Sequence, residues 1–407
     1  MPLESTSQTS PPRFAFLDAL RGIAALGVLF HHLYGLSVMV KVYTSVAPEW
    51  VNWLAGFGAQ GVQMFFVLSG FVIAHSLRAN PLSRSSLGRF MLRRQLRLDP
   101  PYWVALGLSL GLSIAEHIVP GLNPAPYPTF KTIALHTFYL GYIFHAPKLL
   151  DVAWTLCLEI QFYLLFILVL ALFQRPTTQL FFVTDHSQNN SKETPPLALS
   201  TTMIMWLSGA LCIVTMPWSN DVAYFWTTWQ YFVLGTLAYW AMQRKISDKW
   251  LGSFIATFGV GWLIRLRFPP DTRLVAGHVI ESVPNSHLGT ALIVGCLTAL
   301  SLFMLGRLGR LNLGSNARVL QYLGRISYSL YLVHVPVIMV VMKLAFKLTG
   351  YNIAAAIGWF VFCTAACVGA AHLFYLVVEK PSLKWANSFK SNHLQNAGAI
   401  KEAVSLV

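Results

Sequence analysis

Residues 14–34 read FAFLDALRGIAALGVLFHHLY, an apolar run that is long enough to cross a lipid bilayer as a helix. The segment before it is polar and rich in Ser, Thr and Pro, and the run itself contains Asp18 and Arg21. A cleaved signal peptide has a shorter apolar core without such charges. We therefore expect this run to stay in the protein as its first membrane-spanning helix.

Runs of the same kind recur along the whole chain. Hydrophobic residues make up 55% of the 407 residues, charged residues only 11%, and the mean hydropathy is +0.56, whereas a soluble domain carries about 25% charged residues. This composition excludes a water-soluble fold and predicts an all-α, polytopic transmembrane helix bundle of about ten spans. The expected spans are residues 14–34, 55–78, 101–119, 152–173, 199–217, 222–243, 250–266, 287–305, 320–342 and 352–377.

The distribution of basic residues predicts the orientation of these spans. The formal net charge is +14, which in a membrane protein indicates basic cytoplasmic loops and does not imply nucleic acid as a partner. The apolar run 132–144 is too short to span comfortably. If it is re-entrant or lies on the surface, every basic cluster falls on the side of the N-terminus. Both termini are then expected to be cytoplasmic, in a bacterial cell (inner) membrane.

One membrane domain accounts for most of the chain. We expect a cytoplasmic N-terminal tail at 1–13, a single transmembrane domain at 14–380 and a cytoplasmic C-terminal tail at 381–407. The polar stretch 174–200 contains two adjacent prolines and is predicted to be a flexible cytoplasmic loop. Five cysteines lie in apolar runs without metal-ligand spacing, so we expect no metal site. Any chemistry must then lie among the helices.

The first predicted helix carries costly polar residues on one side. Arg21 and His32 are eleven residues apart, which at about 100° per residue returns to within roughly 20° of the same face, and Asp18 shares that face. An ionisable group inside a span costs a few kcal/mol and marks a functional site by default. The alternative is that Asp18 and Arg21 pair with each other near the interface while the histidines are structural.

Two further groups of polar residues lie in or beside predicted spans. Arg93, Arg94 and Arg97 precede the proline pair at the mouth of the 101–119 helix, where guanidinium groups suit phosphate; they are equally consistent with plain topogenic arginines. Glu159 has no basic neighbour one turn away on its own helix and must pair with another helix. Depth estimates place Glu159 and His334 near His32, in the outer half of the membrane.

Several ordered motifs resemble those of the acyltransferase-3 family of integral membrane O-acyltransferases. The matching residues are Leu17 to Gly22 with Arg21 eleven residues before His32; Phe65 to Phe71; Arg94 to Arg97 with Pro101, Tyr102 and Trp103; Trp154 to Glu159; Ile326 to His334; and Glu379, Lys380 and Pro381. Members of this family acylate exopolysaccharides, O-antigens, Nod factors and macrolides. The resemblance implies a membrane-bound transfer of an acyl group, usually acetyl, from acyl-CoA to a hydroxyl of a carbohydrate or glycolipid acceptor.

The resemblance also implies roles for particular residues. It makes His32 the essential histidine, with Arg21 its motif partner, and Arg94 and Arg97 an essential pair for the donor. Glu159, Ser69, Tyr328 and His334 are carried over as candidate site residues only. A neutral imidazole can take the proton of an attacking hydroxyl near pH 7, and an acyl-histidine intermediate stays open. The rival interpretation is a transporter or flippase, since intramembrane charges also line transport pathways.

Overall fold

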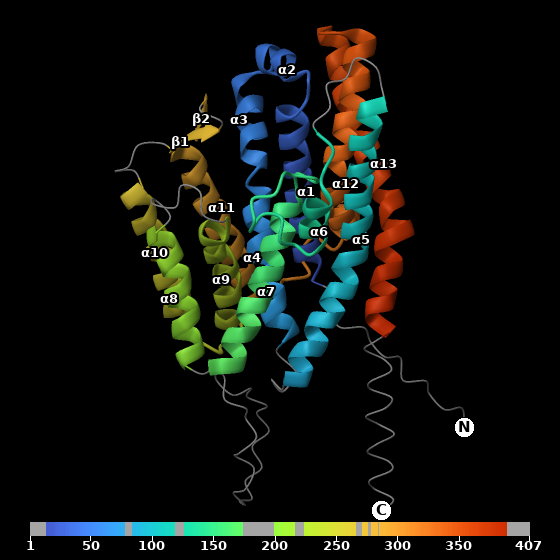
Figure 1. Ribbon diagram of the computed structural model, residues 1–407. Coiled ribbons are helices and arrows are strands. Elements are labelled where there is room, and N and C mark those ends of the chain that lie inside the picture. The colour runs from blue at the N-terminus through green and yellow to red at the C-terminus, as the bar shows by residue number, and fades with distance from the viewer. Residues whose placement is uncertain are drawn as a thin grey trace, which may run out of the picture.

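The computed structural model describes residues 14–77, 84–118, 126–173, 199–215, 224–265, 271–275, 278–283 and 285–388. Long helices lie side by side in one bundle (Figure 1). In chain order the helices are α1 (Ala15–Gly35), α2 (Val40–Val46), α3 (Glu49–Gly58), α4 (Gly61–Ser76), α5 (Arg84–Ile118), α6 (Phe130–Thr137), α7 (Ala153–Phe173), α8 (Leu199–Thr215), α9 (Tyr224–Met242), α10 (Asp248–Arg265), α11 (Asn285–Arg307), α12 (Arg318–Thr349) and α13 (Ile353–Phe374), which continues into a π-helical turn, η2 (Tyr375–Glu379).

The protein is an integral membrane protein built from helices, as the sequence predicted. Each of the ten expected spans overlaps a helix. Within the described part of the chain, six helical stretches are both long and apolar enough to cross a membrane: Ala15–Gly35, Glu49–Ser76, Ala153–Phe173, Gly289–Arg307, Arg318–Thr349 and Ile353–Ser388. The count of ten spans therefore stays a prediction.

The prediction for the third span was wrong at its N-terminal end. Helix α5 begins at Arg84 rather than near 101, so the arginine cluster lies inside the helix and not in a loop before it. Pro100 and Pro101 lie in the middle of this helix and remove two backbone donors. The helix continues through this site beside α12, where Tyr328 Oη donates to the Leu98 carbonyl at 2.8 Å.

The run 132–144 does not form a spanning helix. Helix α6 has eight residues, about 12 Å of helix, and Figure 1 shows it at about the mid-height of α5. Tyr102 Oη of α5 donates to the His136 carbonyl at 2.7 Å, and Tyr139 Oη donates to Asp99 Oδ1 at the same distance. The segment is therefore held at the middle of α5, beside the proline pair.

Two other regions differ in detail from the sequence-based prediction. The charged stretch before α11 forms a two-stranded antiparallel hairpin, β1 (Asp271–Val275) and β2 (His278–Val283), with Asp271 opposite Val283. Helix follows η2 as far as Ser388, so the first eight residues of the predicted tail 381–407 are helical. The predicted loop 174–200 and the terminal tails lie almost wholly outside the described residues.

The site-bearing helices α1 and α12 are parallel and pack with their backbones almost in contact. A Cβ atom at Gly324 would lie 1.9 Å from the Asp18 carbonyl oxygen, and one at Gly22 would lie 2.8 Å from the Leu320 carbonyl oxygen. Small residues permit this approach where no hydrophobic effect drives helices together inside a bilayer. Contacts between positions 18 and 324 near one end, and 32 and 334 further along, fix the parallel direction.

Contacts between helices also place the basic clusters at one end of the bundle. The α9–α10 turn joins the end of α11 through an ion pair of Arg307 with Asp248. Phe16 N, at the start of α1, donates to the Leu311 carbonyl at 2.9 Å. The start of α5 and the end of α13 lie at the same end. Helix α5 runs parallel to α12, with Leu98 at Tyr328 and Glu116 at Lys343, and α13 runs antiparallel to it, with His372 at Tyr322 and Cys367 at His334. We call this the basic end.

Candidate active site

A cavity of about 930 Å³ lies in the half of the bundle nearer the basic end, between α1, α4, α5, α7 and α12. The N-terminal part of α1 contributes Leu17, Asp18 and Arg21, whereas Phe65, Thr155 and Tyr331 line the cavity further along the bundle. The polar side chains that determine its chemistry are Asp18, Arg21, Ser69, Arg94, Arg97, Glu159, Arg325, Tyr328 and Glu379. Its wall is therefore rich in charges of both signs.

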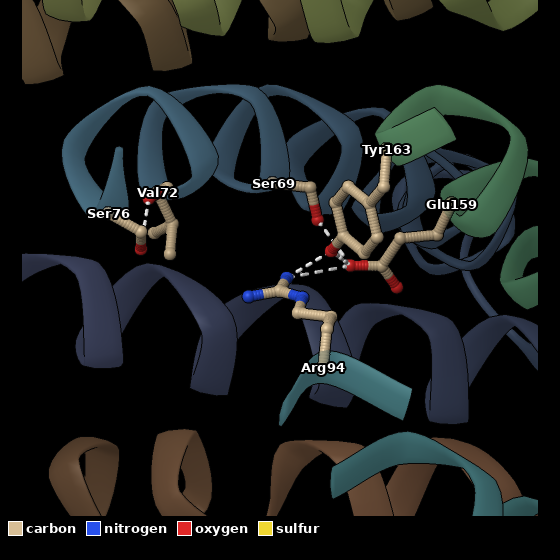
Figure 2. Close-up of polar contacts among 6 residues, drawn as sticks. All are labelled: Ser69, Val72, Ser76, Arg94, Glu159 and Tyr163. Carbon is tan, nitrogen blue, oxygen red and sulfur yellow. Dashed lines mark hydrogen bonds and ion pairs between the residues drawn. The ribbon is translucent and has the colours of Figure 1, made fainter. Parts of the chain in front are cut away.

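Glu159 pairs with a residue on another helix, as we expected from the sequence. Its Oε1 atom accepts from Arg94 Nη2 at 3.2 Å and from Ser69 Oγ at 2.9 Å. Tyr163, one turn further along α7, donates to the same carboxylate and accepts from Arg94. Figure 2 shows these four side chains converging from α4, α5 and α7. The network neutralises Arg94 and stabilises the packing of three helices around one carboxylate.

Asp18 and Arg21 form a second ion pair in the cavity wall. Arg21 Nη1 lies 3.4 Å from Asp18 Oδ1, and the side chains are 27% and 7% exposed. The spacing of three residues on α1 makes the pair local, as on any helix face. Arg21 keeps further N–H donors that this single contact does not use. Asp18 and Arg21 thus pair with each other, as one part of the alternative stated, and both residues line the cavity.

Two guanidinium groups in the cavity remain available to an anion. Arg97 and Arg325 make no hydrogen bond or ion pair within the residues that the structure describes, and Arg97 Nε is buried without a partner. Arg325 was not predicted from the sequence as a site residue. The feature of the sequence that could have indicated it is the glycine just before it, because Gly324 packs α12 closely against α1.

The two histidines that the sequence singled out meet directly. His32 Nδ1 lies 2.7 Å from His334 Nε2, and His334 Nδ1 lies 3.0 Å from the Leu330 carbonyl oxygen. His334 is 1% exposed. Neither histidine lines the cavity, but Tyr331, which does, has its ring centroid 5.8 Å from that of His334. The histidine pair thus lies just beyond the inner end of the cavity.

One buried carboxylate was missed as a site residue. Glu379 is 1% exposed and accepts from Ser329 Oγ at 2.6 Å and from Ser329 N at 3.2 Å. It lies on η2, and π-helical turns of this kind occur frequently at functional sites. The Glu379–Lys380–Pro381 motif was the available signal in the sequence. Its spacing could not reveal that the carboxylate turns into the cavity.

The structure brings together most, but not all, of the predicted site. Asp18, Arg21, Ser69, Arg94, Arg97, Glu159 and Tyr328 line one cavity, and His32 with His334 lies beyond it. Arg93 does not line the cavity. Glu159 does not join the histidines: Thr155 Oγ1 donates to Tyr331 Oη at 3.0 Å, which puts Glu159 about 10 Å nearer the basic end along the helix axes. The depth estimate was too coarse for this distinction, because the ends of the spans are uncertain from sequence by several residues.

Nothing in the described part of the chain resembles a metal site, since no three His, Cys, Asp or Glu side chains cluster there. The arrangement instead suits anion binding at one end of the cavity and proton transfer at the other.

Comparisons with known proteins decide the family. The model of the acyltransferase-3 family, described as an acyltransferase domain, matches residues 14–376. The chain belongs to the acyltransferase-3 family. It is therefore a membrane acyltransferase, and the charged cavity with the adjoining histidine pair is the candidate active site of an enzyme of this class.

Several curated relatives fit this assignment. The chain is 26% identical to Acyltransferase MdmB of Streptomyces mycarofaciens over 411 residues, covering 92% of this chain and 93% of that protein. It is 23% identical to Nodulation protein 10 of Rhizobium leguminosarum bv. viciae, over 59% of this chain and 68% of that protein. Peptidoglycan O-acetyltransferase OatA of Listeria monocytogenes is 27% identical over 40% of this chain, which is 25% of OatA. No solved structure matches the chain.

Proposed function

We propose that this acyltransferase-3 protein moves an acyl group, most simply acetyl, from acyl-CoA to a hydroxyl of a sugar or glycoconjugate, with His32 as the general base. The single observation that carries the proposal is the cavity lined by α1 and α12. Arg97 and Arg325 lie in it without a hydrogen bond or ion pair to the described residues, and the His32–His334 pair lies beyond its inner end. The groups that can bind an anion are thereby separated from the groups that can transfer a proton. A donor with phosphates at one end and a reactive group at the other requires such a separation.

Arg97 and Arg325 are the proposed donor-binding residues. Acyl-CoA carries several phosphates on its nucleotide end and its thioester on a long flexible arm. Guanidinium groups bind phosphate bidentately, and each charge-assisted hydrogen bond is worth about 1.5–3 kcal/mol. Arg94 has a structural task, holding Glu159, so its contribution to donor binding is indirect. The arm then extends past Phe65 and Tyr331 towards the histidines.

The name of one relative and the chemistry of a general base support a carbohydrate hydroxyl as the acceptor. OatA is named for O-acetylation of peptidoglycan, a sugar polymer, which supports a carbohydrate hydroxyl as the nucleophile here. A hydroxyl is a poor nucleophile until a base takes its proton as the bond forms. The acceptor is proposed to arrive from the end opposite the basic end, through the membrane or from its outer surface.

In the proposed reaction, the acyl group moves from sulfur to oxygen and one proton moves from the acceptor hydroxyl to the thiolate through His32. The acceptor oxygen attacks the thioester carbonyl carbon while His32 takes the hydroxyl proton. The carbon–sulfur bond then breaks, the thiolate of CoA leaves and takes the proton back from His32, and the acceptor carries a new ester. The basic end is proposed to face the cytoplasm, where acyl-CoA is made, because basic residues are enriched on that side of membrane proteins.

Transfer to the acceptor can be observed directly. Membranes that contain the protein are incubated with acetyl-CoA whose acetyl group is isotopically labelled, and the glycan, glycolipid and small-molecule fractions are separated by mass spectrometry. Label in an ester of a sugar-containing fraction, absent with His32→Gln membranes, is the expected result. Label that stays wholly with CoA, from a protein shown to be folded, would contradict the proposal.

A further inference from the structure

The hydrogen bonds around His32 and His334 form a chain with one direction. His334 Nδ1 lies 3.0 Å from the Leu330 carbonyl oxygen, and His334 Nε2 lies 2.7 Å from His32 Nδ1. A carbonyl oxygen has no proton to give, so the first bond requires a proton on His334 Nδ1. The position of the proton in the second bond then depends on whether His334 is charged.

The surroundings of His334 favour its neutral form. The side chain is 1% exposed, and no acidic side chain pairs with it among the described residues. The rings beside its imidazole are those of Tyr331 and His32, with centroids 5.8 and 5.0 Å away. A charged imidazole buried without a counterion costs several kcal/mol. A neutral ring with its proton on Nδ1 has a lone pair on Nε2, and this lone pair must accept.

The direction of the chain therefore determines the tautomer of His32. Because His334 Nε2 accepts, His32 Nδ1 donates and carries the proton, which leaves the lone pair of a neutral His32 on Nε2. No described group makes a hydrogen bond with His32 Nε2. In other enzymes the partner on one ring nitrogen likewise fixes which nitrogen can accept a proton.

We propose that His334 is a positioning residue that holds His32 in the Nδ1–H tautomer and thereby makes His32 Nε2 the atom that takes the acceptor proton. The Leu330 carbonyl anchors the chain, and its place one turn earlier on α12 orients the His334 ring. The role of His32 as a base rests on the proposed function. The tautomer itself follows from the hydrogen bonds and from the burial of a neutral His334, without reference to the proposed function.

The inference explains why a second buried histidine is useful here. An isolated imidazole interconverts between two tautomers, and only one of them has its lone pair on Nε2. A proton taken up at His32 Nε2 makes an imidazolium whose Nδ1–H donates more strongly to His334, so the pair also stabilises the charge that forms during transfer. The partner of His32 Nδ1 is His334 and not the adjacent His31, whose Nδ1 lies 2.9 Å from the Ala55 carbonyl oxygen on α3.

Two substitutions of His334 separate positioning from packing. His334→Gln keeps an acceptor, since glutamine places an oxygen as many bonds from Cβ as Nε2. His334→Phe keeps a ring of similar size but accepts no hydrogen bond. His31→Gln is the matched control at a neighbouring histidine. Each protein is purified with ¹⁵N-labelled histidine, and the His32 signals among the 12 histidines are identified by their loss in His32→Gln.

The spectra test the tautomer without reference to activity. We expect wild type, His334→Gln and His31→Gln to carry the His32 proton on Nδ1, and His334→Phe to lose that preference. A proton on His32 Nε2 in the wild type, or a spectrum unchanged in His334→Phe, would overturn the inference. A wild type that consumes no acyl-CoA would refute the proposed function, while the spectra would still decide the pairing.

Steady-state kinetics test whether the tautomer of His32 matters for the transfer. For thioester consumption, His334→Phe is expected to lower kcat about tenfold or more with the donor KM unchanged, because the defect lies in proton transfer and not in binding. His334→Gln should recover most of the lost kcat. Equal losses in the two variants would mean that His334 acts through packing alone, which overturns the positioning role.

Discussion

At the residue scale, the arginines that look alike in the sequence have different tasks. Arg94 is held by Glu159 and Tyr163, Arg97 lines the cavity without a hydrogen bond or ion pair to any described residue, and Arg93 does not line it. Sequence spacing could identify the cluster but could not rank its members, because the partners lie on α4 and α7. The eleven-residue step from Arg21 to His32 correctly indicated one helix face, yet only the structure revealed that His32 bonds to His334.

Arg97→Lys tests donor binding at a single residue. Lysine keeps the charge but loses the bidentate fork that matches a phosphate. We expect the KM for acyl-CoA to rise about tenfold, since losing one charge-assisted hydrogen bond is worth about 1.5 kcal/mol or more. Initial rates of thiol release over a range of donor concentrations measure this change. Arg93→Lys is the matched control and should leave the KM unaltered; a rise of the same size in both variants would argue against a specific role for Arg97.

The Glu159–Arg94 pair is expected to act as a unit. Removing one partner leaves the other charge against a mostly buried wall, where the side chains are 20% and 14% exposed. Glu159→Gln and Arg94→Gln should each lower the Tm of the purified protein. The double variant should fall by less than the sum of the two, with a coupling of about 1–3 kcal/mol. Strictly additive losses would contradict the pairing.

At the element scale, the contact of α1 with α12 is the part of the fold on which the site depends. It places Asp18 and Arg21 in the cavity wall and sets His32 against His334. The sequence predicted both helices but not their contact, because Gly22 and Gly324 are far apart in the chain. The start of α5 was mistaken for a similar reason: prolines usually end a helix, and the bond from Tyr328 to the Leu98 carbonyl at this site becomes visible only after folding.

Gly324→Ala should disrupt that contact. Its Cβ would lie 1.9 Å from the Asp18 carbonyl oxygen, so α1 and α12 must separate by an ångström or more. We expect much less monodisperse protein in size-exclusion chromatography and a lower Tm. Gly358→Ala on α13 is the control, because a Cβ there meets nothing within 4 Å. If the two variants behave alike, close packing at Gly324 is not needed.

At the scale of the whole molecule, alternating helix directions gather the basic clusters at one end, where the cavity lies. Composition and charge were enough to predict a membrane bundle with this segregation. The exact number of spans was beyond sequence reasoning, because length and hydropathy alone do not distinguish a spanning helix from one buried in the protein.

The orientation can be tested with one pair of cysteines. In a chain whose five native cysteines are replaced, Gln243→Cys probes the α9–α10 turn at the basic end, and Tyr351→Cys probes the α12–α13 turn at the other end. An impermeant thiol reagent should label Tyr351→Cys in intact cells and Gln243→Cys only after permeabilisation. The reverse pattern would place the basic end outside, away from cytoplasmic acyl-CoA.

The central claim is that this protein consumes acyl-CoA with His32 as its base, and free-thiol release measures it most directly. Purified protein in membranes is given acetyl-CoA and a panel of sugar acceptors, with His32→Gln alongside at equal, folded concentration. We predict release by the wild type and a loss of at least about a hundredfold in the variant, the range typical of general-base catalysis. Equal release by both proteins, or none by a folded wild type with any donor, would contradict the account.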